Sequence, residues 1–162
     1  MKDDRDALTL AAELLQEAYI HQMSGYLDEA VQLYQQSIDV YPTAEAHTFL
    51  GWTYSFQGKL DDAIEECKKA IEVDPDFGNP YNDIGVYLIE KEQFSEAIPW
   101  LEKATKAKRY ESYHFPHYNL GRVYMAQGLM KRAMEEFQKA LKIEPNYTLA
   151  RDALEETSKQ IN

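Results

Sequence analysis

The stretch "YNLGRVYMAQG" at residues 118–128 decides the fold, because two altered copies of it stand upstream in the chain. Residues 81–93 read "YNDIGVYLIEKEQ", and residues 48–58 read "TFLGWTYSFQG". Each copy places small and hydrophobic residues at helical spacing and leads into a turn. The chain therefore repeats one structural unit.

A second motif measures the distance between units. A glycine, a hydrophobic residue two positions later and an alanine three positions after that occur from Gly25, Gly58 and Gly128, while Glu92 replaces the glycine in the remaining copy. In chain order these four positions lie 33, 34 and 36 residues apart. A period in this range is typical of a solenoid built from helical pairs.

Residues 44–77 show how one unit is built. The first half places Leu50 and Tyr54 on one helical face, and Gly58 ends that helix because glycine tolerates the left-handed backbone. The second half carries an apolar stripe until Pro75 stops the helix. The stripe consists of Ala63, Ile64, Cys67, Ala70 and Ile71.

These residues resemble the signature of the tetratricopeptide repeat, W-x2-L-G-x2-Y, then A-x3-F, then P. The fourth unit matches it with His117, Leu120-Gly121, Tyr124, Ala133, Phe137 and Pro145. The resemblance implies an all-α, right-handed α-solenoid of four tetratricopeptide helix pairs plus a C-terminal capping helix. The expected single domain, 1–162, holds repeats at about 11–43, 44–77, 78–113 and 114–147 and a capping helix at about 148–160.

Composition excludes several classes of function. The net charge of −11 argues against nucleic-acid binding, which needs a basic face. No apolar run approaches the ~18 residues of a membrane span, so we expect no membrane insertion. The acidic N-terminus lacks the apolar core of an export signal, and a single cysteine suits a reducing compartment. These features favour a cytoplasmic protein.

The charge is unevenly distributed along the chain. Residues 1–102 hold 6 Lys/Arg against 21 Asp/Glu, whereas residues 103–151 hold 10 against 4. An acidic end and a later basic segment would allow two copies to attract one another head to tail.

The reactive side chains do not suggest catalysis. His21, His47 and His117 stand at signature positions that the family uses for packing, and Cys67 stands at the signature's phenylalanine position. His114 and His117 near Glu111 lack a fixed third ligand for a metal. We therefore expect no enzyme activity, no metal site and no cofactor.

The resemblance also implies a binding groove, because the first helix of each pair lines the concave face in this family. The expected lining is rich in aromatic, methionine and amide side chains that suit a peptide or protein segment of mostly apolar character. Its members are Leu15, Tyr19, Met23, Phe49, Trp52, Phe56, Asn82, Asp83, Val86, Tyr118, Asn119, Arg122 and Met125.

One known ligand type of the family does not fit. Relatives that grip the acidic C-termini of heat-shock chaperones use a clamp of Lys, Asn, Asn, Lys and Arg across three units. The two possible registers place here Leu15, Tyr19, Phe49, Asn79 and Asp83, or Thr48, Trp52, Asp83, Phe115 and Asn119. Neither set carries the cations, so the clamp is absent.

A longer linker at residues 103–118 offers a second candidate surface. Its cations precede a run of aromatic residues, which favours a docking patch for an acidic partner, although cations late in a helix also complement its dipole. The patch would comprise Lys106, Lys108, Arg109 and Tyr113.

The sequence thus predicts a non-enzymatic scaffold that binds a peptide or protein segment in a concave groove. The alternative is a structural module that associates with itself, weakly, through its acidic N-terminal and basic C-terminal repeats.

Overall fold

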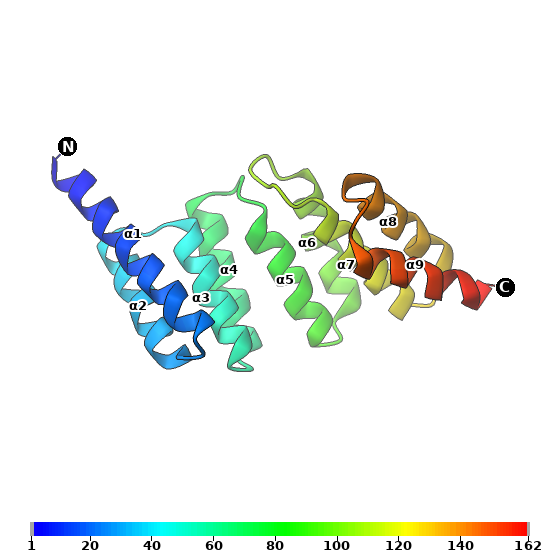
Figure 1. Ribbon diagram of the computed structural model, residues 1–162, viewed down its shortest axis with the longest axis horizontal. Helices are drawn as coiled ribbons and strands as arrows, with labels where there is room; N and C mark the ends of the chain where they lie inside the picture. Colours follow the sequence, from blue (N-terminus) through cyan, green and yellow to red (C-terminus); the bar gives the residue numbers. More distant parts are fainter. Residues whose placement is uncertain (1, 162) are drawn as a thin grey trace. The chain divides into compact units, whose positions relative to one another are not determined.

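The structure is a computed structural model that describes residues 2–161, with side chains from residue 4 on. Within that range it contains nine helices and no strand (Figure 1). The helices are α1 (Lys2–Met23), α2 (Leu27–Val40), α3 (Ala44–Phe56), α4 (Leu60–Val73), α5 (Asn79–Glu90), α6 (Phe94–Lys106), α7 (His114–Ala126), α8 (Met130–Ile143) and α9 (Thr148–Ile161).

The helices pack in consecutive pairs followed by a cap. α1 lies against α2, α3 against α4, and α7 against α8, while α9 packs on α8. The α5–α6 pair meets where Gly85 faces Leu101 and where the Tyr81 ring lies 6.2 Å from that of Trp100. This arrangement confirms the predicted all-α fold of four helix pairs and a capping helix.

Glycines at one position of three pairs let two helices approach closely. A Cβ added at Gly51 would lie 2.9 Å from the carbonyl oxygen of Ala63, and one at Gly121 would lie 2.3 Å from the Phe137 ring. A Cβ added at Gly85 would lie 2.3 Å from the side chain of Leu101. These positions therefore favour glycine, because even a methyl group would collide with the facing helix.

The turn inside each pair passes through the left-handed backbone region. Gly25, Gly58 and Gly128 adopt φ values of 85°, 75° and 76°, as the repeated glycine motif predicts. Glu92 adopts the same conformation, with φ of 59°, although it carries a side chain. The third pair thus keeps the turn geometry of the others at an energetic cost.

Helix ends follow the expected signals with one exception. Thr43 caps α3 by accepting a hydrogen bond from the backbone N–H of Ala46, and Pro75 and Pro145 each follow a helix end by two residues. The first repeat was expected to begin near residue 11, but α1 already begins at Lys2. No proline or glycine interrupts residues 2–23, so the helix extends through the acidic start of the chain.

The chain divides into two compact units, residues up to Pro80 and residues from Tyr81. The core of the first unit centres on Ala18, Ala30, Tyr34 and Leu50. The second unit buries Ile84, Leu101, Leu120, Val123 and Phe137. The expected single domain stays a prediction.

Candidate functional site

In the first unit, four ring-bearing side chains form a continuous aromatic row along α1 and α3. The Tyr19 ring lies 5.7 Å from Phe49, Phe49 lies 6.3 Å from Trp52, and Trp52 lies 4.9 Å from Phe56. Phe56 is 53% exposed and Met23, on the same helix as Tyr19, is 60% exposed. The structure therefore brings the four predicted aromatic residues of the first unit together, and Tyr19 and Phe56 among them are exposed to solvent.

The aromatic row rests on the core of its unit. Phe49 stacks on Tyr34 at 6.1 Å with nearly parallel rings, and Tyr34 donates a hydrogen bond from its hydroxyl to Oε1 of Gln22 at 2.7 Å. Burial raises the pKa of Tyr34, so this phenol stays protonated and keeps its bond. Phe49 therefore serves partly in packing, while Trp52 and Phe56 extend the row outward.

In the second unit, the two predicted asparagines bond to one another. Nδ2 of Asn119 on α7 donates to Oδ1 of Asn82 on α5 at 3.0 Å, and Nη1 of Arg122 donates to Oδ1 of Asn119 at 3.1 Å. Asn82 and Asn119 are 7% and 5% exposed. Both amides were expected to line an open groove, whereas the structure buries them as a polar link between α5 and α7.

The remaining predicted residues of the second unit surround that link. The guanidinium of Arg122 lies 5.9 Å from the Tyr118 ring, and the sulfur of Met125 accepts a hydrogen bond from Thr157 on α9. Tyr118 packs 5.3 Å from Tyr147 in a T-shaped contact. Arg122, Tyr118, Met125 and Val86 are all half-buried.

The carboxyl group of Asp83, at a predicted groove position, lies in the same unit. Asp83 on α5 is half-buried, and the loss of water around it raises the pKa of its carboxyl to about 7. Burial and the nearby Asp83 also raise the pKa of Tyr110, which belongs to the longer linker. Because that linker folds back near α5, the sequence, read unit by unit, offered no signal for this contact.

The proposed docking patch is split between exposed and anchored residues. Lys106, Lys108 and Arg109 are exposed. Tyr113 is half-buried, donates its hydroxyl to the carbonyl of Ala107 and packs 5.4 Å from Tyr110. The tyrosines hold the linker in place, and the cations remain on its surface.

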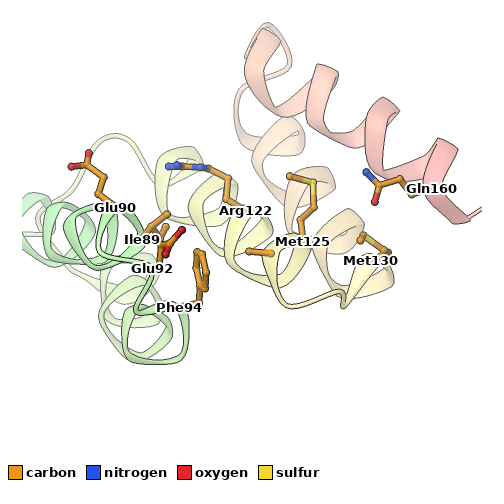
Figure 2. Close-up of a pocket in the computed structure, with 9 residues that line it drawn as sticks. Ile89, Glu90, Glu92, Phe94, Arg122, Met125, Met130 and Gln160 are labelled. Carbon is orange, nitrogen blue, oxygen red and sulfur yellow. The ribbon is translucent and has the colours of Figure 1, made fainter.

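A cleft of about 490 Å³ opens in the second unit near the turn between α5 and α6 (Figure 2). Arg122 extends from α7 on the side of the cleft where Glu90 lies, while Glu92 lies beside Ile89 and Phe94. Of its lining, sequence reasoning had named Arg122 and Met125. The residues it missed include Glu92, whose replacement of a repeated glycine was the available signal.

The histidines are engaged within the fold. Nδ1 of His47 lies 2.8 Å from Glu66, and Nδ1 of His117 lies 2.7 Å from Glu136. Each contact joins the two helices of one pair. His114 instead packs 5.0 Å from the Tyr147 ring, and burial lowers its pKa. Across the described residues, no group of three or more His, Cys, Asp or Glu side chains could hold a metal ion.

Within residues 2–161, none of the helices has both the length and the apolar character needed to cross a bilayer.

Sequence comparison assigns the family. Three family models described as tetratricopeptide repeat match residues 44–77, 79–110 and 114–147, which together make up more than half of the chain. The chain belongs to the tetratricopeptide repeat family. The matches coincide with the second, third and fourth helix pairs, as the signature residues predicted.

Curated relatives share modest identity with this tetratricopeptide repeat chain. It is 31% identical to the probable UDP-N-acetylglucosamine–peptide N-acetylglucosaminyltransferase SPINDLY of Hordeum vulgare over 52% of the chain and 10% of that protein. It is 27% identical to the type IV pilus assembly protein PilF of Pseudomonas aeruginosa over 80% of the chain and 54% of that protein. The chain thus spans about half or less of the length of these relatives.

Solved structures agree with the fold. Pseudomonas aeruginosa PilF superposes with a TM-score of 0.88 at 22% identity, covering 97% of this chain and 70% of that one. The first tetratricopeptide domain of RPAP3, solved with an HSP90 peptide, superposes with a TM-score of 0.68 at 24% identity, covering 74% and 93%. At these identities the likeness shows the repeat architecture alone.

Proposed function

We propose that this tetratricopeptide repeat chain is a non-enzymatic scaffold that binds a mostly apolar peptide or protein segment. The α1/α3 face of the first unit and the α5/α7 face of the second unit supply the contacts. The observation that carries the proposal is the aromatic row, whose members Phe56 and Tyr19 stay well exposed although the fold has other apolar side chains to fill its core.

The site residues match what protein interfaces use. Tryptophan and arginine are enriched among residues that dominate binding energy, and Trp52 and Arg122 stand one in each unit. The half-buried state of both side chains supports this role, because a largely pre-ordered side chain loses less freedom on binding. In the second unit Arg122 is held by Asn119, so the asparagines act by positioning it.

The chemistry of the faces argues against one ligand type. RPAP3 was solved with an HSP90 peptide, but its similarity to this chain is limited to the fold. In both registers, the positions of the clamp that grips acidic chaperone C-termini hold neutral or acidic side chains in this chain, among them Trp52 and Asp83. We therefore expect the acidic C-terminus of a chaperone to bind weakly.

The experiment compares partner capture by wild type, Trp52→Ala and Arg122→Ala from native lysate of the source cells, with bound proteins identified by mass spectrometry. Each variant should weaken capture by about 2 kcal/mol, roughly thirtyfold. Trp100→Phe and Arg151→Ala, in α6 and α9, serve as controls. Wild-type capture by both test variants, with helicity intact, would contradict the proposal. Fractionation of the same cells tests the cytoplasmic location, which stays part of it.

The second candidate is self-association through unlike charges. It is favoured by the exposed cations Lys106, Lys108 and Arg109, which follow an acidic first part of the chain. Light scattering across a salt series tests it, because charge-driven association should dissociate above about 0.5 M salt. A monomer at low salt would rule this candidate out.

A further inference from the structure

The residue that follows the aromatic row in the chain lines an acidic hollow. Gln57 follows Phe56 directly, and its Nε2 donates a hydrogen bond to Oδ1 of Asp28 at 2.8 Å. Asp28 and Glu29 line a hollow of about 320 Å³ together with Gly25, Tyr26, Leu27 and Gln57. Tyr26 is largely exposed at its edge. The hollow therefore offers the exposed Tyr26 ring and two carboxylates, and through Gln57 it adjoins the end of α3, where Phe56 is the last residue.

The first unit as a whole is negatively charged, like the hollow. Residues 1–80 hold 5 Lys/Arg against 16 Asp/Glu, whereas residues 81–162 hold 12 of each. The first unit thus carries the entire net charge of the chain. Such a field attracts cations and repels anionic segments, and the faces of aromatic rings add a local attraction for ammonium and guanidinium groups.

We propose that the α1/α3 face of the first unit binds a segment in which apolar side chains are interspersed with lysine or arginine. The apolar side chains lie on the aromatic row, and a basic side chain reaches Asp28 and Glu29. This inference rests on the proposed function and names the chemistry of the segment. A purely apolar segment would strip water from the two carboxylates without pairing them, which disfavours it.

Trp52 supplies a direct reading of occupancy. The chain has two tryptophans, so Trp100→Phe leaves Trp52 as the one tryptophan, whose emission is excited at wavelengths that its tyrosines do not absorb. Three capped peptides of equal length serve as probes, with leucine alternating with lysine, with glutamine or with glutamate. At low salt the lysine peptide should change Trp52 emission with an affinity at least about tenfold tighter than the glutamate peptide. In about 0.5 M salt that ratio should shrink toward one.

A pair of neutral substitutions tests the acidic hollow. Asp28→Asn with Glu29→Gln keeps shape and the bond to Gln57, and it should weaken the lysine peptide about threefold or more while leaving the glutamine peptide unchanged. The matched control is Asp62→Asn with Glu72→Gln, an equal change of charge on exposed positions of α4. Thermal melts of both double variants establish that each remains folded.

The outcomes distinguish a failure of this inference from a failure of the proposed function. Equal affinity for the lysine and glutamate peptides overturns the inference; the proposed function stands if the glutamine peptide still binds and Phe56→Ala weakens it. A lysine preference that both double variants reduce equally also overturns the inference, because the attraction then belongs to the whole unit. If none of the three peptides changes Trp52 emission, the inference is overturned and this face is removed from the proposed function.

Discussion

Nδ1 of His47 lies 2.8 Å from Oε2 of Glu66, and the same contact recurs 70 residues later between His117 and Glu136 at 2.7 Å. In both cases the histidine stands on the first helix of a pair and the glutamate stands on the second, 19 residues further along the chain. The buried glutamate carboxylate thus accepts a hydrogen bond from the histidine ring of the same helix pair. The contact joins the two helices of one repeat.

The third pair uses the same two positions for a different chemistry. Tyr81 and Trp100, also 19 residues apart, bring their rings to 6.2 Å, and Nζ of Lys103 lies 4.9 Å from the Trp100 ring. In the polar pairs the corresponding lysines, Lys69 and Lys139, bond to the glutamate at 2.7 Å. One set of positions therefore accepts either a polar or an aromatic bridge, each with a lysine on its outer side.

Replacing Glu66 with glutamine should lower stability in a way that depends on pH. Burial alone would raise the pKa of Glu66, but hydrogen bonds from His47 and Lys69 lower it below its ordinary value. A lowered pKa stabilises the folded state above the ordinary range of glutamate and loses that effect as pH falls through the folded pKa. Glu66→Gln should therefore cost about 1–2 kcal/mol near neutral pH and much less in acid.

Urea unfolding followed by circular dichroism at neutral and acidic pH measures this difference. The control is Glu65→Gln, which removes an exposed partner of Lys68 and should change stability by less than about 0.5 kcal/mol. A cost for Glu66→Gln that does not vary with pH would contradict the assigned hydrogen bonds.

Gly121→Ala should destabilise the fourth pair by about 1–3 kcal/mol. The added Cβ would lie 2.3 Å from the Phe137 ring, which is fully buried. Thermal unfolding measures the loss, and Phe137→Leu combined with Gly121→Ala should cost less than the sum of the two single changes. Strict additivity would mean that the two residues do not touch.

Glu92→Gly should stabilise the protein by about 0.5–1 kcal/mol, an unusual direction for a substitution to glycine. Glu92 holds a φ of 59°, which strains a residue with a Cβ, and the other three turns use glycine there. Denaturant unfolding of Glu92→Gly and of Gln93→Gly tests this, since Gln93 precedes α6 with φ of −90° and gains nothing. Destabilisation by Glu92→Gly would point to a stabilising contact of the glutamate side chain.

Cys67 should react slowly with a thiol reagent in the native protein and fast after unfolding. Its side chain is fully buried in α4, so the reagent reaches it when the structure opens. Labelling with a chromogenic disulfide, with and without denaturant, gives the two rates. A fast native rate would show that the second pair opens readily.

The sequence predicted the architecture because each repeat carries its own signals. The glycine in three of the four turns, the glycine at three helix crossings and the proline after a helix act locally, so positions such as Gly58 and Gly121 could be assigned one unit at a time. The family matches confirm the register at residues 44–77 and 114–147.

Side-chain partners were harder to predict than helices. Asn82 and Asn119 stand at groove positions, yet they bond to one another because α5 and α7 bring the amides within reach. His47 was expected at a packing position of the signature, and the structure pairs it with Glu66 of the facing helix. The recurrence of a histidine and a glutamate 19 residues apart was the signal that could have paired them.

Because the contacts of His47 with Glu66 and of His117 with Glu136 stay within one helix pair, each pair balances its own buried charge. Copying or removing such a pair leaves no carboxylate stranded in a neighbouring repeat. An array of such units can therefore lengthen or shorten during evolution without a compensating substitution at the buried glutamates of its other repeats.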